Sequence, residues 1–126
     1  MNAQLLAHKA YSGSAAAIRS PRAMEYDLYA RVTHGLRSAM ADEGPAGFAR
    51  QVQALHDNRK LWTAVAGLVA DPQNALPADL RARLFYLAEF TDQHTAKVLS
   101  EGASADILID INTAVMRGLQ DTGGAA

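Results

Sequence analysis

Four histidines are the residues of this chain whose side chains could bind a metal ion. They are His8, His34, His56 and His94, and no two of them are four residues apart. A zinc site on a helix usually draws two histidines from that spacing, because residues i and i+4 share a helix face. The chain also has no cysteine and no glycine-rich phosphate loop. We therefore expect no metal, no cofactor and no enzymatic activity, and metal analysis of the purified protein would test this.

A modest cluster of arginines in the first third of the chain raises the alternative of RNA binding. The cluster consists of Arg19, Arg22, Arg31 and Arg37. The net charge of the whole chain is −1, so there is no general positive field to attract a polyanion. Glu25 and Asp27 stand between these arginines, which favours a mixed, solvated helix face. Direct RNA binding is not expected.

Polar residues interrupt an otherwise apolar helical pattern around Trp62. Asn58 and Arg59 stand inside the pattern, and Asn74 follows in a turn-rich stretch before a proline. In one interpretation Asn58 and Asn74 satisfy loop backbone groups while Trp62 fills the core. In the other, these residues shape a surface for a partner. Both interpretations stay open at the level of sequence.

Aromatic residues exceed what one buried stripe needs between Leu84 and Phe90. Phe85, Tyr86 and Phe90 lie off the helical stripe of that segment. Surplus apolar surface on a helix is typical of a groove that accepts a partner helix. The candidate partner-binding residues are Asn58, Arg59, Trp62, Asn74, Leu76, Phe85, Tyr86, Phe90 and Met116.

Helices are the elements that must position these residues. Ala and Leu number 40 of the 126 residues, against 16 for Val, Ile and Thr together, and this composition favours helix over sheet. Caps and breakers predict a weak helix over Ala3–Tyr11 and a helix from Ser20-Pro21 to Gly44-Pro45. Further helices are expected over Gly47–Ala70, over Ala78–Ser100, and from a Ser104 cap onward. Phe48, Val52 and Ile107 are expected to face inward.

The length and spacing of these segments predict an all-α fold. We expect a small antiparallel helical bundle or orthogonal array of four main helices plus a short N-terminal helix, in a single domain over residues 1–126. A flexible tail is expected from about residue 120. The N-terminus lacks the pattern of a signal peptide, and the apolar runs are too short to span a bilayer. A cytoplasmic protein with no membrane insertion is expected.

An ordered set of motifs along the chain resembles the FlaF family of flagellar biosynthesis regulators. The resemblance covers roughly residues 8 to 120 and includes a position where much of the family has a tryptophan and this chain has Phe90. The motifs are Pro21 with Glu25 and Tyr26, Asn58 to Trp62, Asp71 to Pro77, Leu80 to Thr95, and Leu108 to Leu119. Each is ordinary alone, and their order and spacing make the set specific.

The resemblance implies a small bacterial protein that acts in flagellum assembly and is needed for flagellin production and export. One hypothesis is a secretion chaperone whose apolar groove binds the terminal helices of flagellin. The alternative is a post-transcriptional regulator of flagellin expression, acting through the partner regulator FlbT or on flagellin messenger RNA. Identification of the protein that co-elutes with this chain would separate the two.

Overall fold

Four long helices make up the regular secondary structure of the part described. The computed structural model describes the backbone of residues 21–125 and the side chains of residues 25–119. The helices are α2 (Pro21–Met40), α3 (Gly47–Ala70), α4 (Ala78–Glu101) and α5 (Asp106–Ala125). The predicted all-α class and four main helices are confirmed. The helix expected over Ala3–Tyr11 and the Ser20 cap lie outside the described residues.

The helix boundaries follow from local residue chemistry. Pro21 is the first residue of α2, where its missing N–H is not needed. Gly102 ends α4 in the left-handed conformation, with φ of 70°, which glycine adopts without a steric penalty. The Ser104 hydroxyl oxygen then accepts a hydrogen bond from the Asp106 backbone N–H at 3.1 Å. The helix so capped continues to Ala125, past residue 120, where the sequence predicts a tail.

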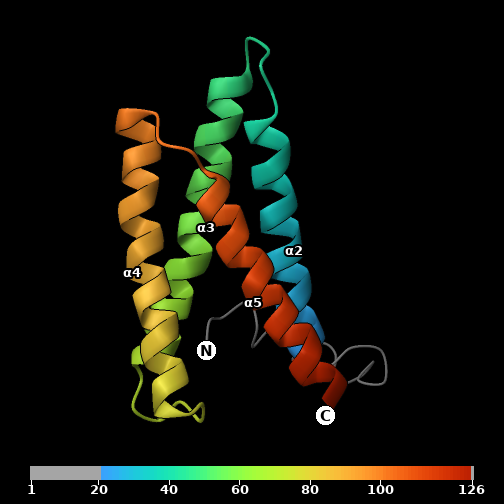
Figure 1. Cartoon of the computed structure of the whole chain (residues 1–126), viewed down its shortest axis with the longest axis vertical. Coiled ribbons are helices and arrows are strands. Elements are labelled where there is room, and N and C mark those ends of the chain that lie inside the picture. Colours follow the sequence, from blue (N-terminus) through green and yellow to red (C-terminus); the bar gives the residue numbers. More distant parts are fainter. Residues whose placement is uncertain (1–20, 126) are drawn as a thin grey trace.

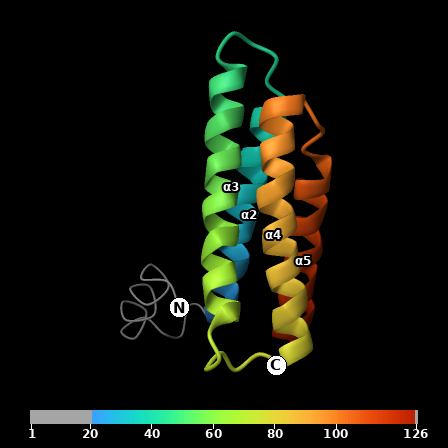
Figure 2. The same cartoon turned by 90° about the vertical axis from the view of Figure 1, so that its left-hand side faces the viewer.

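The helices form an antiparallel bundle rather than an orthogonal array. Consecutive helices run in opposite directions, and α5 returns to pack along α2 (Figures 1 and 2). The ring of helices is therefore α2, α3, α4, α5. By contrast, α4 and α5 approach each other over a short stretch only. In Figure 1 the C-terminal end of α5 lies beside α2, on the other side of the molecule from the start of α4.

Two hydrophobic clusters form the core. The upper cluster contains Leu36, Ala39, Ala54, Leu55 and Leu108. The lower cluster contains Tyr29, Leu61, Trp62 and Ala88. Half-buried side chains of all four helices pack against these clusters. Burial of this apolar surface is the main force that holds the helices together.

Three residues expected to face inward are exposed instead. Phe48 and Val52 of α3 are 69% and 37% exposed. Arg59 of α3 lies opposite Asp92 of α4, so Phe48 lies opposite residue 103, beyond the end of α4, and Val52 lies near that end. No described helix continues far enough to cover Phe48, whereas Val52 lies level with the last turn of α4 and is partly covered.

Ile107, the third exception, is 39% exposed. Its neighbour Leu108 faces the core, and a helix turns by about 100° at each residue. Thr113 contacts Arg37 of α2 on one flank of α5, which leaves Ile107 on the opposite flank. That flank is only partly covered by the neighbouring helices.

Candidate functional site

A chain of buried hydrogen bonds joins α3 to α5. The Trp62 indole N–H donates to Asn112 Oδ1 at 2.8 Å, and Asn112 Nδ2 donates to Asn58 Oδ1 at 2.7 Å. The Trp62 ring also meets Tyr29 of α2 edge to face, with 5.8 Å between ring centroids. Trp62 fills the core, as one interpretation of the sequence predicts. Asn58 bonds to another side chain, so the expectation that it satisfies loop backbone groups is wrong.

The burial of Asn58 and Trp62 limits their role as partner contacts. Both are fully enclosed by the helices, so they influence a partner only by holding α3 and α5 in place. Asn112 is not among the contact residues predicted from the sequence. The available signal was its position, one turn after Leu108 on the inward stripe of α5, where an amide needs a hydrogen-bonding partner.

One phenol and one carboxyl group have pKa values displaced from their ordinary values. Burial raises the pKa of Tyr29 well above its ordinary value, and the nearby Glu25 carboxylate adds to the shift. The pKa of Asp42 is lowered, first by the backbone N–H of Gly44 and then by the Arg50 side chain. Tyr29 belongs to the core and Asp42 to the α2–α3 turn. Both pKa shifts therefore result from contacts that hold the fold together, and neither marks a reactive group.

Asn74 fixes the turn between α3 and α4. Its Nδ2 donates to the Leu68 carbonyl at 2.9 Å, and its Oδ1 accepts from the Leu76 backbone N–H at 2.9 Å. Arg81 of α4 donates from Nε to the Leu76 carbonyl at 3.2 Å. These bonds confirm that Asn74 ties loop backbone groups. They also hold Leu76 in place while its side chain is 38% exposed.

Phe85 and Tyr86 lie on the outside of α4. Phe85 is 39% exposed and Tyr86 is 66% exposed. Arg81, which binds the Leu76 carbonyl, lies one turn before Phe85 on the same face of α4. Leu76, Phe85 and Tyr86 therefore occupy one end of the bundle, and we call these three residues the α4 apolar surface.

The remaining candidates lie at three other places. Arg59 donates from Nε to Asp92 Oδ1 at 2.6 Å across the α3–α4 interface. Phe90 stacks on His94, with 5.5 Å between ring centroids, and a His94 ring nitrogen lies 2.7 Å from the Ser104 carbonyl oxygen. Met116 packs half-buried against the lower cluster. The predicted contact residues are thus divided between the interior, the α3–α4 turn, the α3–α4 interface, the α4 apolar surface and the α4–α5 side.

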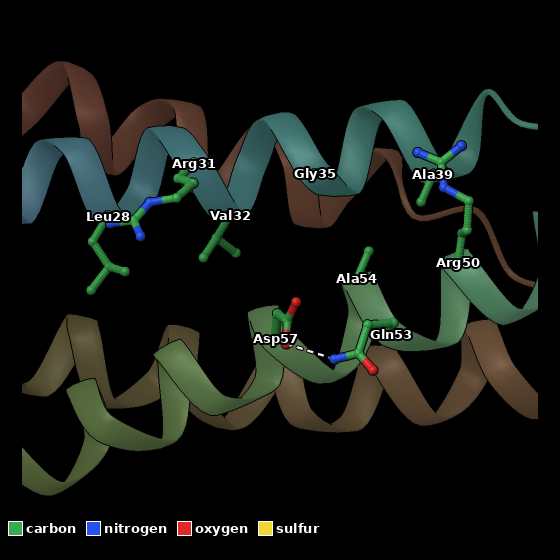
Figure 3. A pocket seen from close by; sticks show the side chains of 9 residues that line it. All are labelled: Leu28, Arg31, Val32, Gly35, Ala39, Arg50, Gln53, Ala54 and Asp57. Carbon is green, nitrogen blue, oxygen red and sulfur yellow. Dashed lines mark hydrogen bonds between the residues drawn. The ribbon is translucent and has the colours of Figure 1, made fainter.

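An open groove of about 370 Å³ runs between α2 and α3 (Figure 3). Small residues such as Gly35 and Ala54 line its middle, and Arg31 and Arg50 lie toward its ends. Arg50 is bound to Asp42 and Ser38. Arg37, by contrast, points toward α5 and donates to the Thr113 hydroxyl at 3.2 Å. Of the four arginines in the cluster predicted from the sequence, the two whose side chains are described, Arg31 and Arg37, thus face different sides of α2.

The part of the chain that the structure describes holds neither a metal site nor a helix able to cross a membrane. No group of three His, Asp or Glu side chains in that part of the chain is placed to hold a metal ion. In the same part, none of the helices has the length and apolar character that crossing a membrane requires.

Comparison with known families gives one match. The family model of flagellar protein FlaF matches residues 7–119, which is most of the chain. No similar curated protein and no similar solved structure was found. The chain therefore belongs to the FlaF family, as the sequence motifs predict.

Proposed function

We propose that this member of the FlaF family is a flagellum assembly factor that promotes flagellin synthesis and export. In this proposal it acts in the cytoplasm, without catalysis, as a secretion chaperone that binds the terminal helices of flagellin. Family membership supports the flagellar role. The exposure of Leu76, Phe85 and Tyr86 at one end of the bundle is the observation that supports binding of an apolar partner.

The chemistry of the α4 apolar surface fits an amphipathic helix. Aromatic side chains supply large contact areas at low entropic cost and are frequent at the centres of interfaces. Leu76 is held by backbone hydrogen bonds at 2.9 Å and 3.2 Å, so its position is already fixed before binding. The Arg59–Asp92 ion pair lies two turns along α4 from Phe85 and provides a polar border. An apolar centre with a polar border is the usual composition of an interface.

The proposed partner is an amphipathic helix whose apolar face becomes buried only when the filament assembles. Flagellin has amphipathic terminal segments that coil together in the filament, and before assembly those segments need shielding from water. A helix laid across the exposed aromatic residues gains that shielding by burying its apolar face against them.

Co-purification with flagellin tests the proposal. The wild-type chain, Phe85→Ala and Tyr86→Ala would each be expressed with tagged flagellin, and the flagellin retained would be measured. Loss of an aromatic contact at the centre of an interface typically costs about 2 kcal/mol, roughly a thirtyfold weaker affinity. We expect both variants to bind much more weakly while their thermal unfolding stays close to that of the wild type.

Phe48→Ala is the matched control, because Phe48 is an equally large aromatic residue that is 69% exposed at the other end of α3. It should bind flagellin like the wild type. A wild-type chain that does not bind flagellin contradicts the proposal, as does equal weakening by all three variants. Retention of FlbT in place of flagellin would favour the alternative, regulation of flagellin expression through that regulator.

A further inference from the structure

A layer of polar side chains crosses the interior of the bundle between the two hydrophobic clusters. Each described helix contributes one residue to it, and all four are at most 1% exposed. The residues are Thr33 of α2, Asn58 of α3, Thr91 of α4 and Asn112 of α5. We call this set the polar layer.

Helical spacing places the members of the polar layer at one level. The upper cluster contains Leu36, Leu55 and Leu108, which lie three or four residues, about one turn, from Thr33, Asn58 and Asn112 respectively. The lower cluster contains Tyr29, Trp62 and Ala88, which lie about one turn from Thr33, Asn58 and Thr91 on the other side. The polar residues therefore share the space between the clusters.

The hydrogen bonds of the polar layer have a fixed direction. The indole N–H of Trp62 can only donate, so the Asn112 atom that it contacts must be the oxygen. The Asn112 amide nitrogen then donates to Asn58 and makes the contacted atom of Asn58 an oxygen too. The chain of bonds ends at Asn58 Nδ2, a donor that needs an acceptor.

Asn58 Nδ2 and the hydroxyls of Thr33 and Thr91 have no hydrogen-bond partner among the described residues. Neighbouring threonines behave differently. The Thr95 hydroxyl donates to the carbonyl oxygen of Thr91 at 2.6 Å, and that of Thr113 donates to Ile109 at 2.8 Å. The hydroxyls of Thr33 and Thr91 do not donate to the backbone carbonyl four residues earlier in this way. Buried polar groups in proteins are nearly always paired with protein or with ordered water.

We propose that the polar layer binds one ordered water molecule between α2, α3 and α4. The water accepts a hydrogen bond from Asn58 Nδ2 and bonds to the hydroxyls of Thr33 and Thr91, each of which can donate or accept. Three polar partners match the usual coordination of a buried water. The water connects α4 to the network that already joins α3 and α5, and so it contributes to the position of the helix that carries the α4 apolar surface.

A crystal structure of the full chain at about 1.5 Å resolution tests the site directly. We expect one water within about 3.2 Å of Asn58 Nδ2 and of both threonine hydroxyls. A direct hydrogen bond from Asn58 Nδ2 to either hydroxyl, or a polar layer without a water peak, would overturn the proposal.

The sign of a stability change gives an independent test in solution. Thr91→Val replaces the hydroxyl with a methyl group of similar size. If the hydroxyl binds water, its removal leaves a water with one partner fewer, and the melting temperature falls. If the hydroxyl has no partner, the variant loses only an unpaired polar group, and the melting temperature stays the same or rises.

Thr95→Val is the matched control on the same helix, since the Thr95 hydroxyl donates to a backbone carbonyl within α4. We expect Thr91→Val to lower the melting temperature by more than this control does. A Thr91→Val chain as stable as the wild type, or more stable, contradicts the bound water.

Discussion

The α4 helix is joined to its two neighbours in the ring in different ways. Against α3 it packs closely, with Ala88 in the same cluster as Trp62 and an ion pair between Asp92 and Arg59. Against α5 it makes close contact over a short stretch, where His94 meets the Ser104 carbonyl. We call the first the closed seam and the second the loose seam.

The difference shows where the bundle resists change and where it can adjust. The closed seam buries apolar side chains of both helices, so separation of α3 from α4 exposes the lower cluster to water. Opening the loose seam exposes less apolar surface to water. The α5 helix then stays attached through its contacts with α2 and through the Trp62–Asn112 hydrogen bond. Changes at the closed seam should therefore cost more stability than changes at the loose seam.

Trp62→Ala should have the largest effect. Trp62 is 1% exposed, contacts Tyr29 and donates to Asn112. Truncation of a buried Trp creates a cavity, and here it also removes the donor of Asn112 Oδ1, so we expect a loss of about 3–5 kcal/mol in the free energy of unfolding. Urea unfolding followed by circular dichroism measures it.

Phe48→Ala is the control for this prediction, because both residues are aromatic and both lie on α3. With Phe48 mostly exposed, the change should stay within about 0.5 kcal/mol. Equal losses of unfolding free energy in Trp62→Ala and Phe48→Ala would contradict the prediction that burial decides the cost of losing an aromatic side chain on α3.

The alkaline limit of stability should depend on Tyr29. Its folded-state pKa is raised, while its unfolded-state pKa is the ordinary value of about 10. The neutral phenol therefore stabilises the fold fully below about pH 10, and this contribution is lost progressively as the pH rises further. Unfolding free energy measured from pH 8 to pH 12 should decline less steeply in Tyr29→Phe. Parallel curves for the two chains would contradict a buried neutral phenol.

Much of this arrangement could be predicted from the sequence, for identifiable physical reasons. Helix ends depend on one or two local residues, so Gly102 and Ser104 could be assigned from residue type alone. The turn role of Asn74 was predictable in the same way. The inward position of Trp62 followed from apolar spacing along α3.

Contacts between helices were not predictable, because they depend on register and on where a neighbouring helix ends. Phe48 satisfies the apolar spacing of α3 but extends beyond the end of α4. Asn58 interrupts that spacing, and its partner Asn112 lies 54 residues away along the chain. The exposure of Ile107 also has no local signal, since this residue fits the apolar pattern of α5 and is nonetheless 39% exposed.

Gly102→Ala tests the connection at the loose seam. A Cβ at this position would meet no atom within 4 Å, so the only cost is that of the left-handed backbone conformation, about 1–2 kcal/mol. Gly67→Ala is a matched control, because its Cβ also meets open space but lies within α3, where Ala should stabilise by up to about 1 kcal/mol. Thermal unfolding should therefore shift in opposite directions for the two variants. A shift of the same sign in both would mean that the α4–α5 connection does not depend on this conformation.

Arg59→Ala should have the smallest effect, although it breaks the ion pair with Asp92 across the closed seam. The side chains of Arg59 and Asp92 are 38% and 58% exposed, so water and salt screen their attraction. Such pairs contribute about 0.2–1 kcal/mol, far less than the burial of Trp62 on the same helix. A double-mutant cycle with Asp92→Ala, at low and high salt, isolates the pairwise energy. If the coupling were several kcal/mol and insensitive to salt, the closed seam would depend on charge rather than on apolar burial.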